Sequence, residues 1–266
     1  MLRARLQQTR SARGGTRRIA AVLGCAAVVT GVSLAGPVPI GAAGSAVGAA
    51  VASVSPAPGE TVGVAHPVTV TFAGQVPDRA AAERAVNVVP AGASAPAAGS
   101  FTWLDDRVVE WTPAQPLPAH TAIGVSVGAF ATGFETGASV VSVADISEHT
   151  FTVSIDGVVA RQMPASMGKP RYPTPTGQFT ALEKQRYVTF DSRTIGIPLD
   201  DPEGYLIKGE YGVRVTWGGV YVHSAPWSVG SQGYANVSHG CINLSPDNAA
   251  WYFDTVGVGD PIIVQA

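Results

Sequence analysis

A mainly β fold in two domains is predicted by three observations on the sequence. Glycine (31 of 266 residues) and proline (20) are frequent, while charged residues make up only 14%, a balance that favours short strands and turns over long salt-bridged helices. From residue 51 onward, β-branched and aromatic runs alternate with turns at roughly regular spacing. With 46% apolar residues, the chain can bury a sizeable core in one or two domains.

The first 36 residues have the order of an export signal. Six arginines precede an apolar run over residues 19–36, and small residues follow it. The run is near the lower length limit for a membrane-spanning helix, so cleavage as a signal peptide and retention as an N-terminal anchor both stay open. We expect an exported protein of the periplasm or cell wall, attached to the plasma membrane through residues 19–36 if the leader is retained.

The charge distribution excludes one class of partner. Six of the 17 basic residues lie before residue 19, and all 19 acidic residues lie after it. The body of the chain is therefore acidic, whereas a protein that follows nucleic-acid phosphates needs the opposite charge. We predict no nucleic-acid partner.

Two cysteines are present, Cys25 in the apolar run and Cys241 near the other end. Cleavage of the leader removes Cys25 and retention places it in lipid, so we predict no disulfide. Residues 22–25 loosely resemble a lipoprotein-processing site, which leaves lipidation of Cys25 open. Cys241 is then a lone thiol in an oxidising compartment, which calls for an explanation.

Residues 37–50 are uncharged and rich in glycine and alanine, which predicts a flexible linker. Residues 51–149 contain many short strand-like runs, the pattern of a β-sandwich domain. Its one helical segment, residues 77–85, has Asp78 as an N-cap. We expect Trp103 and Trp111 to belong to its core.

The second domain, residues 150–266, starts with a strand pair that turns at Asp156-Gly157. Further strands follow near residues 187–192 and 211–225. Ser245 and Pro246 then predict the start of a short helix, and residues 259–266 form a last strand.

Two histidines and one thiol gather within 19 residues of this domain. An imidazole within reach of a cysteine generates the thiolate and can later protonate a leaving amine. His223 ends a strand and can point across at Cys241. His239 lies two residues before Cys241, and both structural support of the site and direct participation stay open for it. Gly240 allows a tight turn there, so the Gly240 and Cys241 amides could face a developing oxyanion.

Two other interpretations of these residues are open. Cys241 could be an inert buried thiol, and His223, His239 and Cys241 could be zinc ligands, with an aspartate completing the set. No further cysteine or histidine is nearby. We predict no metal and no cofactor.

One segment carries a family resemblance. His223, fourteen residues, and then Ser238-His239-Gly240-Cys241-Ile242-Asn243 resembles the active-site signature of the YkuD-type L,D-transpeptidases, cysteine enzymes of the bacterial wall. The sequence around His223 (GGVYVHSAPW) and the helix that follows Cys241 agree with it. Residues 51–149 resemble the immunoglobulin-like domain that precedes the catalytic domain in actinobacterial, particularly mycobacterial, members.

The resemblance implies an immunoglobulin-like β-sandwich followed by a β-rich catalytic domain with a short helix after the cysteine. It implies that Cys241 attacks a tetrapeptide stem of peptidoglycan, that D-alanine leaves, and that a diaminopimelate side-chain amine takes the acyl group in a 3→3 cross-link. His223 is then the base, oriented through the Ser224 carbonyl. The remaining implied site residues are His239 and Gly240 near the nucleophile, and Tyr205 (a lid tyrosine), Gly219, Trp227, Ser238 and Asn243 for substrate binding.

The resemblance also implies acylation of Cys241 by carbapenem β-lactams. The sequence departs from it at Phe190, where some relatives carry a methionine, and the role of Phe190 in the pocket stays open. An L,D-carboxypeptidase, in which water resolves the acyl-enzyme, and a catalytically silent wall-binding protein are the alternatives. We expect the first domain to be a spacer; the sequence says nothing of the oligomeric state.

Overall fold

The computed structural model describes residues 48–266. The predictions for the leader (residues 1–36), for Cys25 and for most of the linker (residues 37–50) lie outside this range. Within it, no helix combines the length and the apolar character needed to cross a membrane.

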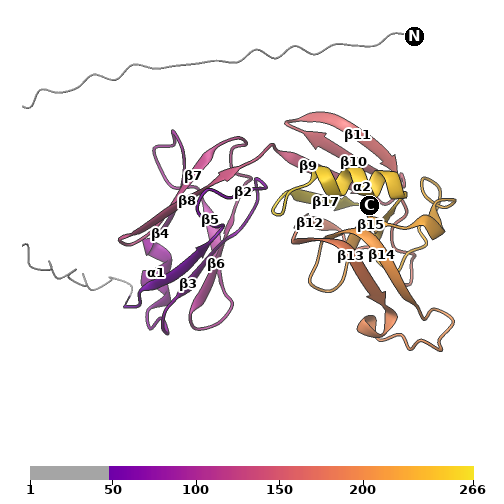
Figure 1. The fold of residues 1–266 in the computed structure, drawn as a ribbon, viewed down its shortest axis with the longest axis horizontal. Helices are drawn as coiled ribbons and strands as arrows, with labels where there is room; N and C mark the ends of the chain where they lie inside the picture. Colours follow the sequence, from indigo (N-terminus) through magenta and orange to yellow (C-terminus); the bar gives the residue numbers. More distant parts are fainter. Residues whose placement is uncertain (1–47) are drawn as a thin grey trace, which may run out of the picture. The chain divides into compact units, whose positions relative to one another are not determined.

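The first domain consists of two four-stranded sheets (Figure 1), in the orders β1-β3-β6-β5 and β2-β8-β7-β4. Alternate residues of β3 and β4 are buried, and side chains from both sheets share one apolar cluster, which is the packing of a β-sandwich. The strands are β1 (Val51–Ser55), β2 (Thr61–Val62), β3 (Val68–Phe72), β4 (Val86–Pro90), β5 (Gly99–Trp103), β6 (Val108–Pro113), β7 (Ala122–Val127) and β8 (Phe130–Thr136).

The predicted helix of this domain is confirmed as α1 (Arg79–Ala85). The Asp78 carboxylate accepts a hydrogen bond from the Ala81 amide at 2.9 Å, as an N-cap does. Trp111 is buried in the core, also as predicted. Trp103 is only partly buried: its ring stacks on Phe72, and its indole N–H donates to a Glu83 carboxylate oxygen at 2.8 Å.

The second domain has a five-stranded sheet, β11-β10-β9-β17-β12, and a four-stranded sheet, β13-β14-β15-β16. A large apolar cluster joins them. The strands are β9 (Val140–Asp145), β10 (Thr150–Ile155), β11 (Val158–Pro164), β12 (Gly177–Thr180), β13 (Glu183–Asp191), β14 (Leu206–Arg214), β15 (Tyr221–Ser224), β16 (Ile242–Leu244) and β17 (Pro261–Gln265). The mainly β fold of both domains is thus confirmed.

The five-stranded sheet of the second domain begins before the boundary that we placed between residues 149 and 150. Strand β9 pairs with β10 in a hairpin and, in parallel, with β17 at the end of the chain. The sequence of β9 alternates like the strands before it, and its partner β17 is remote in sequence. No local signal therefore assigns β9 to the second domain.

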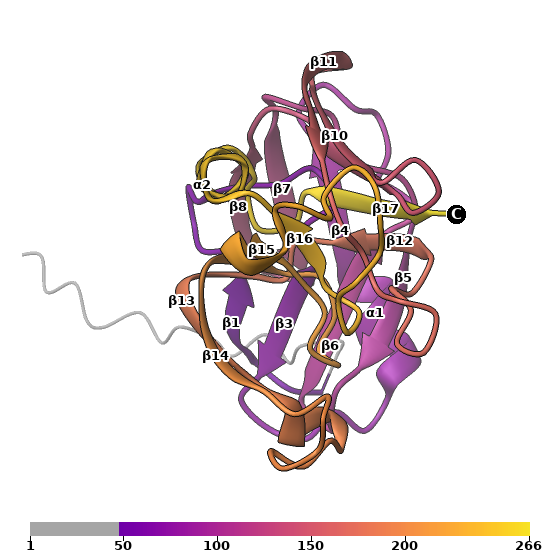
Figure 2. The same cartoon turned by 90° about the vertical axis from the view of Figure 1, so that its right-hand side faces the viewer.

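Helix α2 (Pro246–Thr255) starts where the sequence predicts. The Ser245 hydroxyl oxygen accepts a hydrogen bond from the Asn248 amide at 3.4 Å. The helix packs against β14 and β15 (Figure 2). It therefore supports the strand that ends in His223 and Ser224.

Parallel pairing of β15 with β16 creates the geometry of the site. His223 on β15 lies opposite Asn243 on β16, and Cys241 directly precedes β16. The long connection between the two strands includes the short 3₁₀ helix η2 (Pro226–Ser228), and the connection from β13 to β14 includes the 3₁₀ helix η1 (Ser192–Ile195). Residues of both connections line one pocket with Cys241.

Candidate active site

Cys241 follows a braced turn. Gly240 has φ +113°, a conformation that favours glycine. The Ser238 hydroxyl donates to the Cys241 carbonyl at 2.6 Å and accepts from the Gly240 amide at 3.1 Å. The Thr174 hydroxyl, buried beneath the turn, donates to the Gly240 carbonyl at 2.9 Å.

This bracing corrects one prediction. The Gly240 amide is occupied by Ser238, because a short-range bond closes the turn. It therefore does not face the pocket as an oxyanion donor. The Cys241 amide is the one of the two that remains a candidate.

His223 is held in a single orientation at the end of β15. Its side chain is buried, with 3% of the residue exposed, and its Nδ1 lies 2.8 Å from the Ser224 carbonyl oxygen. A carbonyl can only accept, so Nδ1 carries the proton and Nε2 keeps a lone pair. Ser224 is thus placed as the resemblance implies.

Aromatic rings flank His223 on two sides. The ring centroid of Phe190 lies 4.3 Å and that of Trp227 6.0 Å from the imidazole. Burial lowers the pKa of His223 to about 4, although the bond to Ser224 acts in the opposite direction. His223 is therefore a neutral base at physiological pH, and Phe190, whose role the sequence left open, covers one of its faces.

The Cys241 thiol is also neutral in the free protein. Burial raises its pKa to about 11, and the Tyr221 backbone acts in the opposite direction. Its Sγ lies 3.7 Å from the Gly219 carbonyl oxygen, to which it donates. Among the described residues no hydrogen bond joins the thiol to His223, although both side chains line the same pocket.

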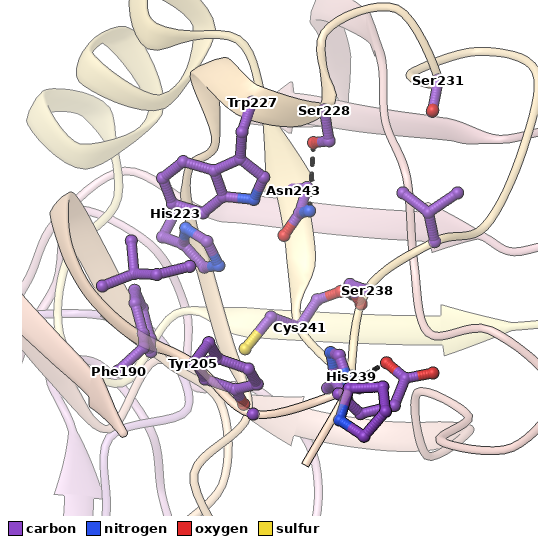
Figure 3. A pocket seen from close by; sticks show the side chains of 15 residues that line it. Phe190, Tyr205, His223, Trp227, Ser228, Ser231, Ser238, His239, Cys241 and Asn243 are labelled. Carbon is purple, nitrogen blue, oxygen red and sulfur yellow. Dashed lines mark hydrogen bonds and ion pairs between the residues drawn. The ribbon is translucent and has the colours of Figure 1, made fainter. Parts of the chain in front are cut away.

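These groups line a pocket of about 380 Å³. Figure 3 shows Cys241 among its neighbours, with His223 and Trp227 on one side and Tyr205 and His239 on the other. The lining side chains are Phe190, Pro202, Glu203, Gly204, Tyr205, Ile207, His223, Trp227, Ser228, Ser231, Val237, Ser238, His239, Cys241 and Asn243. Seven of the ten predicted site residues are thus lining residues; Ser224, Gly219 and Gly240 act through the backbone bonds described above.

Asn243 presents an unused acceptor in this pocket. Its amide Nδ2 donates to the Ser228 hydroxyl at 3.1 Å, and its Oδ1 has no partner although only 3% of the residue is exposed. A buried carbonyl without a partner is costly. A bound molecule with an N–H group at this position would satisfy it.

The segment over the pocket, residues 192–205, is closed by its own hydrogen bonds. The Ser192 hydroxyl donates to the Ile197 carbonyl at 2.9 Å and accepts from the Tyr205 amide at 3.0 Å. We call this segment the lid. It carries Tyr205 over the His239 ring, at 5.0 Å between centroids.

Sequence reasoning missed Glu203 and Lys169. Glu203 accepts from His239 Nε2 at 2.9 Å and forms an ion pair with Lys169. The only available signal was the position of Glu203 two residues before Tyr205. The distances along the chain hide the cluster, because the three residues lie on three different loops.

The zinc interpretation gains no support from the geometry. Across residues 48–266, no three histidine, cysteine or acidic side chains are grouped closely enough to hold a metal ion. His239 pairs with Glu203, and His223 with the Ser224 carbonyl.

Known proteins share this architecture. Residues 139–264 match the L,D-transpeptidase catalytic domain family YkuD, and residues 45–130 match a bacterial Ig domain. L,D-transpeptidase 1 of Mycobacterium tuberculosis is 61% identical over 216 residues, which cover 80% of this chain and 84% of the relative.

Solved structures agree with this. An L,D-transpeptidase from Mycobacterium smegmatis is 66% identical, with a TM-score of 0.78 over 82% of this chain and 99% of its own. A structure described as LD transpeptidase LdtMt1 in complex with imipenem is 60% identical, with a TM-score of 0.75 over 82% and 99% of the two chains. A braced cysteine beside a buried neutral histidine, on a fold shared along most of the chain with these enzymes, leaves one conclusion: this chain belongs to the YkuD family of L,D-transpeptidases and is such an enzyme, preceded by a bacterial Ig domain.

Proposed function

We propose that the chain forms 3→3 cross-links in peptidoglycan by the reaction of its family, with Cys241 as nucleophile and His223 as base. The observation that carries these roles is the neutral His223 imidazole, whose unprotonated Nε2 is available in the same pocket as the Cys241 thiol. A transfer between peptide stems needs a base for the thiol and an acid for the leaving amine. One imidazole can serve as both.

In the first half-reaction, the Cys241 thiol proton moves to His223 Nε2 while the sulfur attacks the carbonyl carbon of the third residue in a tetrapeptide stem. The C–N bond to D-alanine then breaks, and the departing amine takes the proton from the imidazolium. An acyl-enzyme thioester remains. The pKa values of about 11 for the thiol and about 4 for the imidazole disfavour an ion pair in the free enzyme, so proton transfer accompanies the attack.

In the second half-reaction, the side-chain amine of a diaminopimelate in another stem attacks the thioester carbonyl. His223 accepts a proton from the amine and returns it to the departing sulfur. The amide of the cross-link forms and the free thiol is regenerated. The unpartnered Asn243 Oδ1 is suited to accept an N–H from a stem peptide during these steps.

Mass spectrometry of the products tests this proposal. The full chain and its Cys241→Ala variant are incubated with a diaminopimelate-containing disaccharide-tetrapeptide. A dimer that lacks one D-alanine, and is absent with the variant, is the expected result. Release of D-alanine without dimer would identify an L,D-carboxypeptidase, and the absence of turnover would favour a wall-binding protein.

We also propose that carbapenems acylate Cys241. A relative with 60% identity has been solved in complex with imipenem. Opening of the β-lactam ring by the sulfur gives a thioester, with the thiol proton passing through His223 to the ring nitrogen. We expect intact-mass analysis to show one imipenem mass added to the wild-type chain and none added to Cys241→Ala.

Export to the cell wall, with residues 1–36 as signal or anchor, completes the proposal. Peptidoglycan lies outside the cytoplasm, so the substrate requires it. Fractionation of cells that express the chain with and without residues 1–36 tests this: loss of the protein from the membrane and wall fractions on deletion is the expected result.

A further inference from the structure

Three loops converge beside Cys241 at one carboxylate. Glu203 belongs to the lid, Lys169 to the loop that follows β11, and His239 to the loop that carries the cysteine. The same oxygen, Oε2 of Glu203, accepts from Lys169 Nζ and from His239 Nε2, the latter at 2.9 Å. The side chains are 24%, 31% and 19% exposed for Lys169, Glu203 and His239, so the cluster is largely shielded from solvent.

Lys169 is a fixed anchor for this carboxylate. Its amide donates to the Ser238 carbonyl at 3.0 Å, which attaches its loop to the cysteine loop. The neighbouring Gly168 amide donates to the Thr174 hydroxyl at 2.8 Å. These bonds fix the backbone from which the Lys169 side chain starts, and its ammonium group donates to Glu203 of the lid.

The hydrogen bond to Glu203 determines which nitrogen of His239 carries the proton. Lys169 lowers the pKa of Glu203, which is thus a carboxylate that can only accept. Nε2 of His239 must then carry a proton. Burial lowers the pKa of His239 as well, so the ring is neutral and its Nδ1 keeps a lone pair.

The orientation of the His239 ring is fixed by the same residues. Tyr172 and Tyr205 flank the ring at centroid distances of 4.8 and 5.0 Å, and Glu203 holds its edge. A rotation of the ring would break the bond to the carboxylate. His239 lines the catalytic pocket two residues from the nucleophile, so the same contacts fix how its ring is presented to the pocket.

The lid is linked to the rest of the pocket by this cluster. Its internal bonds through Ser192 make residues 192–205 a closed unit. Among the described side chains of the lid, Glu203 forms hydrogen bonds to other loops of the pocket. Release of Glu203 would therefore allow the lid and Tyr205 to move together.

We propose that Glu203 is a positioning residue for acyl transfer: anchored by Lys169, its carboxylate fixes the tautomer and orientation of His239 and holds the lid over Cys241. Nothing in the similarity to known proteins assigns this role. It rests on the proposed chemistry at Cys241, but it concerns the state of His239, which can be observed without turnover.

Two variants of the full chain test it. Glu203→Gln keeps the size of the side chain and removes its charge, and Lys169→Met removes the anchor while Glu203 remains. The matched control is Asp200→Asn, an exposed acid of the same lid. Nitrogen-15 NMR of the histidines reports the tautomer of His239, and the acylation of Cys241 by imipenem and the formation of dimer report the reaction.

In the wild type we expect the nitrogen-15 shifts of His239 to show an Nε2–H tautomer. In both variants we expect these shifts to move toward a mixture of tautomers. We expect kcat/KM for dimer formation to fall at least about tenfold, because a misplaced reacting group of this kind costs one to two orders of magnitude. The Asp200→Asn variant keeps the wild-type values.

Three outcomes would overturn the proposal. They are an unchanged His239 spectrum in both variants, a fall in kcat/KM without any change at His239, and an equal fall in Asp200→Asn. If instead neither wild type nor variants form dimer but the His239 shifts respond as expected, the positioning role stands and the reaction assignment fails. The two proposals can therefore fail separately.

Discussion

At the scale of single residues, the same burial displaces two pKa values in opposite directions. It stabilises the neutral form of each group, so the pKa of His223 falls to about 4 and that of Cys241 rises to about 11. The usual picture of a preformed thiolate is not favoured here. The base is available over the whole physiological pH range, and the nucleophile becomes charged only as it reacts.

The rate of imipenem acylation should therefore be almost independent of pH between about 5 and 9. Below pH 5 the rate should fall, because His223 becomes protonated with a pKa of about 4 and can no longer accept the thiol proton. Stopped-flow measurements across this range check the profile. A tenfold rise for each pH unit would instead show that a free thiolate is the reacting species.

Replacement of His223 should affect the reaction more than the fold. His223→Asn keeps a donor for the Ser224 carbonyl but removes the base, so we expect acylation to slow by about 10² to 10⁴. Circular dichroism should show an intact β fold. A variant that acylates at the wild-type rate would remove His223 from the mechanism.

At the scale of elements, the pairing of β13 with β14 positions the Phe190 ring against His223. A Cβ added at Gly209 on β14 would lie 2.4 Å from a ring carbon of Phe190, too close for the ring to stay. Phe190 in turn lies against His223 at 4.3 Å. Because Gly209 has no side chain, the Phe190 ring can lie against His223 and shield the imidazole from water.

The Gly209→Ala variant should move Phe190 away from His223 and let water approach the imidazole. The pKa of His223 should then rise from about 4 toward the ordinary value of 6.5. Acylation should therefore begin to fall at a higher pH than in the wild type. The pH–rate profile measures this shift, with Gly74→Ala, whose Cβ meets no atom, as control. An unchanged profile would mean that Phe190 does not protect the base.

The brace under the cysteine turn can be tested in the same way. The buried Thr174 hydroxyl satisfies both the Gly168 amide and the Gly240 carbonyl, and Thr174→Val leaves both without it. We expect a loss of about 1 to 3 kcal/mol in the free energy of unfolding and slower acylation. Urea unfolding measures the loss of stability. The control is Thr176→Val at an exposed position, which should change the free energy of unfolding little. Equal losses in the two variants would contradict the role of Thr174 under the turn.

At the scale of the whole molecule, two buried groups make the free energy of unfolding depend on pH in opposite directions. His223 has a lowered folded pKa, so its contribution is lost as pH falls below 6.5. Asp260, which is 2% exposed, has a pKa raised by burial from 3.8 to about 6. Its contribution is complete below pH 3.8 and is lost as pH rises through 6.

The variant Asp260→Asn isolates this effect. The stability of the wild type minus that of the variant should be about 1 kcal/mol larger at pH 5 than at pH 8, as a shift of this size requires. Urea unfolding at both pH values checks it. A difference that grows with pH would mean that the Asp260 carboxylate is paired rather than desolvated.

Local signals made much of this molecule predictable. The caps Asp78 and Ser245, the alternation of the strands and the His223 to Cys241 signature each occupy a short stretch of sequence, and each agrees with the structure. The parts that were missed depend on contacts between remote residues. The pairing of β9 with β17 shifted the domain start, the Ser238 bond removed Gly240 as an oxyanion donor, and the Glu203 cluster joins three loops.

The high pKa of the Cys241 thiol has a consequence for its chemical lifetime. Peroxide attacks thiolates, and the raised pKa of Cys241 keeps it as the neutral thiol at pH 7. Oxidation to sulfenic acid and beyond, which would destroy the nucleophile, is correspondingly slow. The raised pKa that delays activation until substrate arrives therefore also protects the nucleophile from oxidation.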